Sequence, residues 1–168
     1  MAQTQKGSAG KNRHSGNVNE KTPSALLIED HEIVLKMFKD YEELKSNGSA
    51  TDKRDLALKI CAELKVHTQI EEELYYPKLR EQAGEASLLN ETKVEHESAE
   101  QLIRQIESMS PDEALYDARV KVLGEYLKHH IKEEQNEMFP AAKKAGIETP
   151  ELADEMLERK EVLKKKLH

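Results

Sequence analysis

The chain of 168 residues is poor in the residue types that make disulfides, tight turns and aromatic cores. Its one cysteine, Cys61, excludes an intrachain disulfide, which suits a reducing cytoplasm. Because Cys61 neighbours Ile60, we expect it to be a small core residue rather than a redox accessory. There is no tryptophan, aromatic residues make up only 4%, and glycine and proline are few. Glu, Lys, Leu and Ala dominate instead, so we expect a single all-α domain.

Long apolar stretches are missing as well. No run approaches the roughly 20 apolar residues of a membrane span, and the N-terminus lacks the apolar segment of a signal peptide. The net charge of -7 argues against a nucleic-acid partner. We therefore expect a cytoplasmic protein, monomeric or weakly homo-oligomeric, without a nucleic-acid or membrane partner. Residues 1–21 have almost no apolar side chains and are expected to be a disordered tail before a domain over 22–168.

Two stretches share one pattern, HTQIEEELYYP at residues 67–77 and HIKEEQNEMFP at residues 130–140. In each, a histidine is followed four residues later by a glutamate, and an aromatic-Pro pair stands at the same distance beyond. Residues four apart share a helix face and lie about 5–6 Å from each other. Each stretch therefore directs an imidazole and a carboxylate to one point, which is half of a metal site.

A histidine between two acidic residues precedes each stretch: Asp30-His31-Glu32 lies before the first, and Glu95-His96-Glu97 lies before the second. The order His, HxxxE, His, HxxxE indicates a two-helix unit used twice. Apolar residues at spacings of three and four, together with capping signals, predict four long helices and a short fifth one. We expect them over Pro23–Lys45, Lys53–Gln82, Ser87–Met109, Ser110–Gly146, and from Thr149-Pro150 onward. This pattern is typical of an up-down-up-down four-helix bundle with a short C-terminal helix.

Two details of these helices are expected from single residues. Pro77 should kink or loosen the turn in which it stands, because proline lacks an N–H group. The C-terminal lysines 160 and 164–166 are interpreted as a solvated face that suits the helix dipole.

Histidines and glutamates occupy positions where the helical pattern requires apolar side chains. Burying an unpaired carboxylate costs several kcal/mol, and the inward positions offer no Lys or Arg to compensate it. Bound cations would compensate both carboxylates and imidazoles. Nitrogen and oxygen donors without thiolate suit Fe, Mn or Zn, and six or seven donors suit two ions about 3.5–4 Å apart. The candidate metal ligands are His31, His67, Glu71, His96, Glu100, His130 and Glu134, with Glu71 and Glu134 as bridges.

Two alternatives stay open in this set. His129 also has a partner four residues on, Glu133, so that pair could replace His130 and Glu134. The spacing to the aromatic-Pro pair favours His130. Glu100 lies four residues after His96 and is a seventh ligand, an acceptor that orients a ligating histidine, or an exposed charge.

The ordered set of His, HxxxE, His and HxxxE resembles the hemerythrin-like, or HHE cation-binding, family over about residues 24–146. The resemblance implies a four-helix bundle around two iron ions joined by an oxo or hydroxo bridge. His31, His67, Glu71, His96, His130 and Glu134 match family ligand positions. The oxygen-carrying members have a histidine where Glu100 stands, and an aspartate five residues after the last histidine where this chain has Glu134 at four.

The resemblance favours a di-iron protein that reacts with or senses oxygen, nitric oxide or peroxide. A carboxylate-richer site favours ferric iron, which argues against reversible oxygen carriage. A catalase- or peroxidase-like enzyme and an iron-handling protein are alternatives at the same centre. A metal-free helical interaction module is the remaining interpretation.

Overall fold

A computed structural model describes residues 21–167, and these residues form helices joined by short turns. The helices are α1 (Pro23–Asn47), α2 (Ala50–Ile70), α3 (Tyr76–Ala83), α4 (Ala86–Ser108), α5 (Tyr116–Glu133), α6 (Phe139–Ala145) and α7 (Pro150–Lys166). Two π-helical segments, η1 (Glu71–Tyr75) and η2 (Glu134–Met138), join α2 to α3 and α5 to α6. The predicted disordered tail, apart from Lys21, lies outside the described residues.

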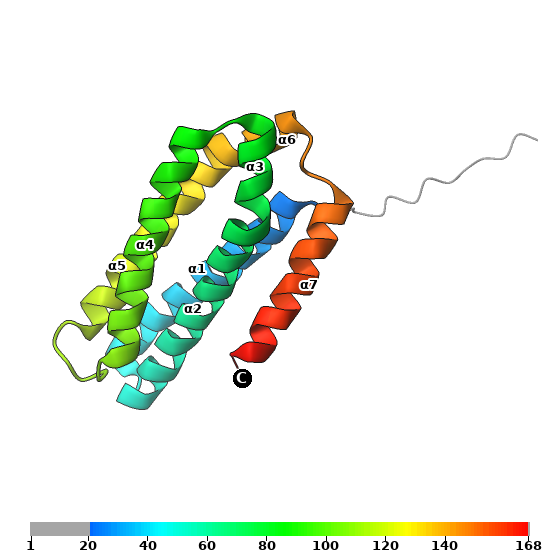
Figure 1. The fold of residues 1–168 in the computed structure, drawn as a ribbon. Helices are drawn as coiled ribbons and strands as arrows, with labels where there is room; N and C mark the ends of the chain where they lie inside the picture. The colour runs from blue at the N-terminus through cyan, green and yellow to red at the C-terminus, as the bar shows by residue number, and fades with distance from the viewer. Residues whose placement is uncertain (1–20, 168) are drawn as a thin grey trace, which may run out of the picture.

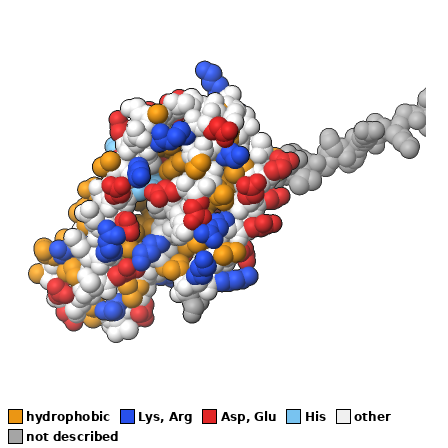
Figure 2. All heavy atoms as spheres, in the orientation of Figure 1, with side chains coloured by type: hydrophobic (Ala, Val, Ile, Leu, Met, Phe, Trp, Pro, Cys, Tyr) orange, Lys and Arg blue, Asp and Glu red, His pale blue; other side chains and the backbone are white. Residues whose placement is uncertain are grey.

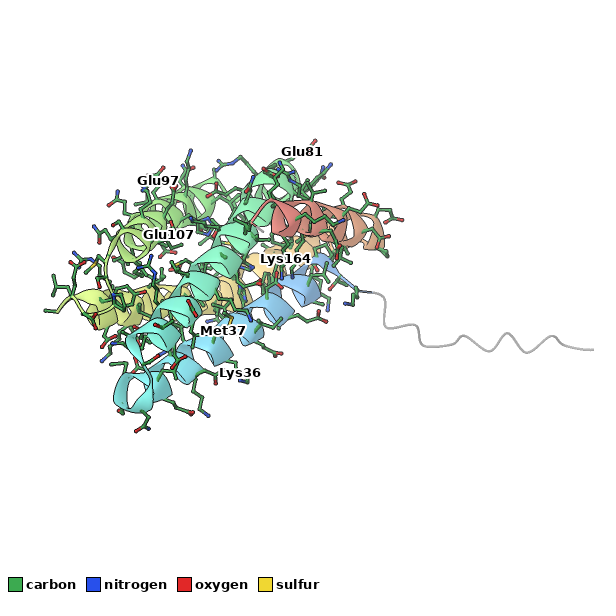
Figure 3. The ribbon with its side chains drawn as sticks, turned by 90° about the horizontal axis from the view of Figure 1, so that it is seen from below. Lys36, Met37, Glu81, Glu97, Glu107 and Lys164 are labelled. Atoms are coloured by element: carbon green, nitrogen blue, oxygen red, sulfur yellow. The ribbon has the colours of Figure 1, made fainter. Side chains whose placement is uncertain are left out.

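Four long rods form the bundle, and the predicted fold class is confirmed (Figure 1). They are α1, the continuous rod α2–η1–α3, α4, and the rod α5–η2–α6. The short fifth helix, α7, packs against α1 and α2 on the outside of the bundle (Figures 1 and 3). None of the described helices is long and apolar enough to cross a membrane.

The ends of the helices follow their capping residues. Thr22 accepts a hydrogen bond from the Ala25 N–H, and Pro23 then begins α1. Ser49 and Asp52 form a reciprocal capping box at α2. The turn between α1 and α2 is therefore only two residues long, shorter than the gap of residues 46–52 between the first two predicted helices. Gly84 and Gly146 end α3 and α6 at φ 71° and 75°, a conformation that costs glycine little.

The predicted start of the fourth helix at Ser110 is wrong. Residues 109–115 form turns, and α5 begins only at Tyr116. Glu113 accepts a hydrogen bond from the Ser110 backbone N–H, as in a capping box. The chain nevertheless makes a turn there, and the ring of Tyr116 is fully buried at the base of the bundle.

Each π-helical segment stands directly before an aromatic-Pro pair. Pro77 cannot donate to the carbonyl of Glu73, four residues back, so the regular α-helical pattern cannot continue through it. The Tyr76 N–H instead bonds to the carbonyl of Glu71, five residues back. The same bond joins Phe139 to Glu134 before Pro140. The loosened turn predicted at Pro77 is thus present, and it recurs in the second half of the chain.

Two apolar clusters fill the bundle, one on either side of a polar layer. One cluster contains Leu27, Ile70, Leu89 and Met138, whereas the other contains Val34, Leu64, Ile103 and Leu127. On each of the four long rods, the change from one cluster to the other falls at or next to a histidine of the repeated pattern. Cys61 is fully buried in the second cluster, and burial raises the pKa of its thiol to about 12, so it is a core residue as expected.

Candidate metal centre

Six of the seven predicted site residues meet in the polar layer. His31 comes from α1, His67 and Glu71 from the second rod, His96 from α4, and His130 and Glu134 from the last rod. All six side chains are at most 8% exposed, and Glu71 and Glu134 are fully buried. Donor atoms of five of them, His31, His67, Glu71, His130 and Glu134, lie within 4.8 Å of one another. His96 joins them through its Nε2, which lies 3.5 Å from Glu71 Oε2.

The donor atoms of His31, His67 and the two glutamates converge at one side of this cluster. The Nε2 atoms of His31 and His67 are 3.0 Å apart, which is a hydrogen-bond distance when one imidazole is protonated there. His31 Nε2 lies 3.1 Å from Glu134 Oε2, and His67 Nε2 lies 3.0 Å from Glu71 Oε1. Neighbouring ligands of one ion, each about 2.1 Å from it, are themselves about 3 Å apart. The spacing therefore fits a set of metal ligands.

The second side of the cluster is looser. His130 Nε2 lies 3.7 Å from Glu71 Oε2 and 3.5 Å from Glu134 Oε2. The rings of His96 and His130 are 4.9 Å apart between centroids. Glu71 thus presents one oxygen to each side of the cluster.

Several polar atoms of the cluster lack hydrogen-bond partners within the described part of the chain. Both oxygens of Glu71 and Oε2 of Glu134 are buried without one. A buried polar atom without a partner costs about 1–3 kcal/mol, and more when it is charged. These atoms, together with imidazole nitrogens, are a donor set that a transition-metal ion would satisfy.

Without metal, protons on the imidazoles balance the carboxylates. Burial alone would lower the pKa of His67, but Glu71 and Asp30 raise it to about 10. Burial likewise opposes the charge on Glu71, yet His67 and His130 hold the pKa of that carboxyl well below its usual range. Burial would also lower the pKa of His130, which Glu134 and Glu71 raise well above its ordinary value. Metal binding must therefore displace protons from the imidazoles.

Carboxylates stand behind three of the four imidazoles, on the side away from the cluster. Asp30 Oδ2 lies 3.7 Å from His67 Nδ1, and Glu95 Oε2 lies 3.8 Å from His130 Nδ1. Glu72 Oε1 accepts a hydrogen bond from His96 Nδ1 at 2.9 Å. The Glu72 hydrogen bond places the proton on His96 Nδ1, so that its Nε2 is free to bind a metal. Asp30 and Glu95 lie beyond hydrogen-bond distance and attract a proton to Nδ1 of their histidines by their charge alone.

Sequence reasoning did not assign roles to these carboxylates, although one signal was present. An acidic residue directly precedes each lone histidine of the repeat, Asp30 before His31 and Glu95 before His96. Each of these acids faces the histidine of the HxxxE pair on the neighbouring helix. Glu72 carries no comparable signal, because it is one of three consecutive glutamates.

Tyr76 is a further residue of the centre that the sequence did not single out. Its hydroxyl donates a hydrogen bond to Glu134 Oε1 at 3.1 Å and lies 3.5 Å from His130 Nε2. Burial and the charges of Glu134 and Glu71 raise the pKa of Tyr76 well above its ordinary value, so the phenol keeps its proton. Tyr76 therefore orients one glutamate of the cluster.

Glu100 does not reach the cluster, and its inclusion among the candidate ligands is corrected by its position. Its side chain is 57% exposed and forms an ion pair with Arg104, one turn along α4, at 2.7 Å. Of the three alternatives for Glu100, the structure shows the exposed charge. The choice between the pair His130 and Glu134 and the pair His129 and Glu133 also follows from their positions. His130 and Glu134 face the cluster, whereas the side chain of His129 is 61% exposed.

A cavity of about 510 Å³ opens beside the cluster, between α2, α4 and α5. His67, His96 and His130 form part of its wall, and apolar side chains such as Leu64 and Leu127 form another part. Small molecules can therefore reach the imidazoles through the cavity.

The charged side chains of the surface are mixed. On the face shown in Figure 2, acidic and basic side chains are interspersed without a large patch of one sign.

Comparisons with known proteins bear on the family and the fold of the chain. The hemerythrin HHE cation binding domain matches residues 22–142 of the chain. A crystal structure of a hemerythrin HHE cation binding domain-containing protein from Mycobacterium kansasii has a TM-score of 0.71 at 24% sequence identity. The match covers 86% of this chain and 88% of that one, and at this identity it shows the fold.

A protein named DNA nickase from Nostoc sp. is 28% identical over 112 residues. The match covers 67% of this chain but only 31% of that protein. The chain thus spans about a third of the length of this curated relative.

Proposed function

This chain belongs to the hemerythrin HHE cation-binding family, and we propose that it holds two iron ions that react with oxygen, nitric oxide or peroxide. The arrangement of Glu71 carries the proposal. Its Oε1 faces His67 at 3.0 Å, and its Oε2 faces His96 and His130 at 3.5 and 3.7 Å. A carboxylate with one oxygen toward each of two imidazole groups is suited to bridge two ions.

Each residue of the centre has a role in this proposal. His31 and His67 would hold one ion through Nε2, and His96 and His130 would hold the other. Glu71 and Glu134 would supply carboxylate oxygens to the pair and neutralise part of its charge. Iron supplies redox chemistry toward small oxidants, and the nitrogen and oxygen donors suit it.

Access supports reactivity rather than a purely structural role for the metal. A structural metal site is closed, whereas a reactive one keeps an open position. The cavity beside the cluster reaches His67, His96 and His130, so it provides a route for a diatomic molecule or peroxide. Tyr76 stands within the centre with its proton retained, and its hydroxyl donates a hydrogen bond to Glu134.

The test is metal analysis combined with optical spectroscopy of protein purified without a histidine tag. The apoprotein is loaded with ferrous iron under nitrogen, desalted and analysed for iron. Two irons per chain and a new near-ultraviolet band after admission of air would support the proposal. The Glu71→Gln variant should bind at most one iron. A wild-type chain that retains no iron would contradict the proposal and favour a metal-free interaction module.

A catalase-like activity is the second candidate, favoured by the size of the cavity. Its volume of about 510 Å³ exceeds what one diatomic molecule needs, so peroxide has room to enter and water to leave. Oxygen evolution from peroxide, followed with an oxygen electrode, separates the two candidates. Many turnovers per iron pair indicate an enzyme, whereas a single spectral change without sustained oxygen evolution indicates a sensor or a stoichiometric reaction.

A further inference from the structure

In both halves of the repeat a carboxylate stands behind the histidine of the HxxxE pair. The partner of the second oxygen of that carboxylate differs between the two halves. In the first half, Asp30 faces His67 Nδ1 with Oδ2. Its other oxygen, Oδ1, accepts a hydrogen bond from the ammonium group of Lys160 on α7. The carboxylate therefore stands between an imidazole of the centre and a cation on the outside.

In the second half, Glu95 faces His130 Nδ1 with Oε2. Its other oxygen, Oε1, lies 3.3 Å from Nε2 of His129, and Glu133 Oε1 lies 3.1 Å from the same nitrogen. No Lys or Arg of the described region forms an ion pair with Glu95 or Glu133. Where the first half has an ammonium group, the second half has three converging donor atoms.

We propose that Glu95, His129 and Glu133 bind a divalent cation, which takes the place that the Lys160 ammonium occupies in the first half. One donor atom from each residue lies within 4.8 Å of the others. Two carboxylates and a neutral imidazole carry a charge of about -2, which a divalent ion neutralises. One nitrogen and two oxygen donors suit Zn²⁺, Fe²⁺ or Mn²⁺.

Two further observations support an ion at this place. First, Oε2 of Glu133 is a buried atom without a hydrogen-bond partner. Second, the site is open to solvent, because the His129 side chain is 61% exposed, so an ion can enter and keep water ligands. His129 and Glu133 are the pair of the HHIKEE segment that the buried cluster leaves unused.

The outer site is coupled to the buried centre through Glu95. This carboxylate is a ligand of the outer ion, and its other oxygen lies 3.8 Å from His130 Nδ1. A cation on Glu95 draws electron density from its oxygens and weakens their electrostatic attraction for the Nδ1 proton of His130. His130 then becomes a weaker donor toward the inner ion. The outer cation therefore tunes the inner centre, an effect that rests on the function proposed above.

Zinc binding tests the outer site. Equilibrium dialysis of the apoprotein against Zn²⁺ compares the wild type with His129→Ala and Glu133→Gln. Each variant should bind one zinc fewer than the wild type. Glu125→Gln is the matched control, because Glu125 is an exposed glutamate of α5 paired with Lys128, and it should bind as many ions as the wild type. Equal zinc numbers in the wild type and both site variants would overturn the proposal.

The outer and inner sites can be separated in the same assay. His31→Ala damages the buried centre and leaves the outer donors intact. The His31→Ala variant should keep the zinc ion that His129→Ala loses. The test of the outer site therefore holds even if the inner centre binds no metal. For the coupling, Zn²⁺ added to iron-loaded protein should shift the near-ultraviolet band in the wild type and not in His129→Ala. The same shift in both proteins would refute the coupling.

Discussion

The substitution Glu71→Gln separates the energetics of the metal from those of the folded chain. Glutamine keeps the shape of the side chain and removes its charge. Glu71 is fully buried, neither of its oxygens accepts a hydrogen bond, and each oxygen faces a different side of the cluster. The variant therefore loses one anionic donor toward both proposed ions at once.

The expected magnitudes follow from binding linkage. A metal present at 1,000 times its dissociation constant stabilises the folded chain by about 4 kcal/mol. For a domain of this size, each kcal/mol moves the thermal midpoint by about 2–4 °C, so filling the centre should raise it by about 8–16 °C. Glu71→Gln should abolish most of this rise. Without metal, His67 can lose its proton when Glu71 is replaced, so the metal-free variant should avoid the roughly 3–5 kcal/mol that an uncompensated buried charge costs.

Thermal unfolding followed by circular dichroism, with ferrous iron under nitrogen or with a chelator, measures both quantities. Glu100→Gln is the control, because Glu100 is an exposed glutamate paired with Arg104, and it should keep the full rise. A Glu71→Gln variant that keeps the metal-dependent rise would refute the bridging role. Loss of the rise in Glu100→Gln would refute the placement of Glu100 outside the centre.

Three further outcomes are expected. In metal-free protein the pKa of His67 is raised to about 10, above its unfolded value of about 6.5, so its contribution to the free energy of unfolding is fully present below pH 6.5 and lost as pH rises through 10. The free energy of unfolding from urea titrations should therefore fall between pH 6.5 and 10. A flat profile would contradict the pairing of the His67 imidazole with carboxylates. Lys160→Met should raise metal affinity in calorimetric titrations, because Asp30 loses its competing cation and attracts the Nδ1 proton of His67 more strongly. Lys164→Met, which breaks an outer ion pair of the same helix, should leave the affinity unchanged; equal changes in both variants would mean that α7 acts only through packing. Tyr76→Phe should lower the unfolding free energy of the metal-free protein by about 1–3 kcal/mol, measured by urea titration, because Glu134 loses its hydrogen-bond donor; an unchanged stability would deny that bond.

Much of the centre could be predicted because its residues interrupt an apolar pattern. His31, His67, His96 and His130 stand where a helix facing a core requires apolar side chains, and the structure buries all four. The same reasoning failed for Glu100. Its position four residues after His96 satisfies the spacing rule, but α4 turns that position toward solvent, where Arg104 is available. Spacing along one helix gives the angular position of a side chain only approximately, so a residue at the edge of the inward face can point to solvent.

Contacts between helices could not be predicted in the same way. The carboxylates behind the imidazoles come from neighbouring helices, and Lys160 reaches Asp30 from a helix that follows the bundle. The lysines of α7 were interpreted as a solvated face, yet Lys160 and Lys164 pair with acids of α1 and α2. Lys165 and Lys166 are exposed, as interpreted. A charge run gives no indication of which residues will find partners, because the partners are distant in sequence.

The spacing from each histidine to its aromatic-Pro pair was the most informative feature of the sequence, and the backbone explains why. Pro77 and Pro140 each require a break in the α-helical hydrogen bonds, and in both rods the break is a π-helical segment of five residues. Each segment begins at the glutamate of the HxxxE pair, whose carbonyl accepts the N–H five residues on. The proline therefore fixes where the wide turn lies, and the wide turn coincides with the glutamate that enters the cluster. A histidine shifted by one residue, as His129 is, stands at another angle around the helix and faces outward. The equal spacing from histidine to proline in the two segments thus indicates that His67 and His130 point in equivalent directions, into the cluster.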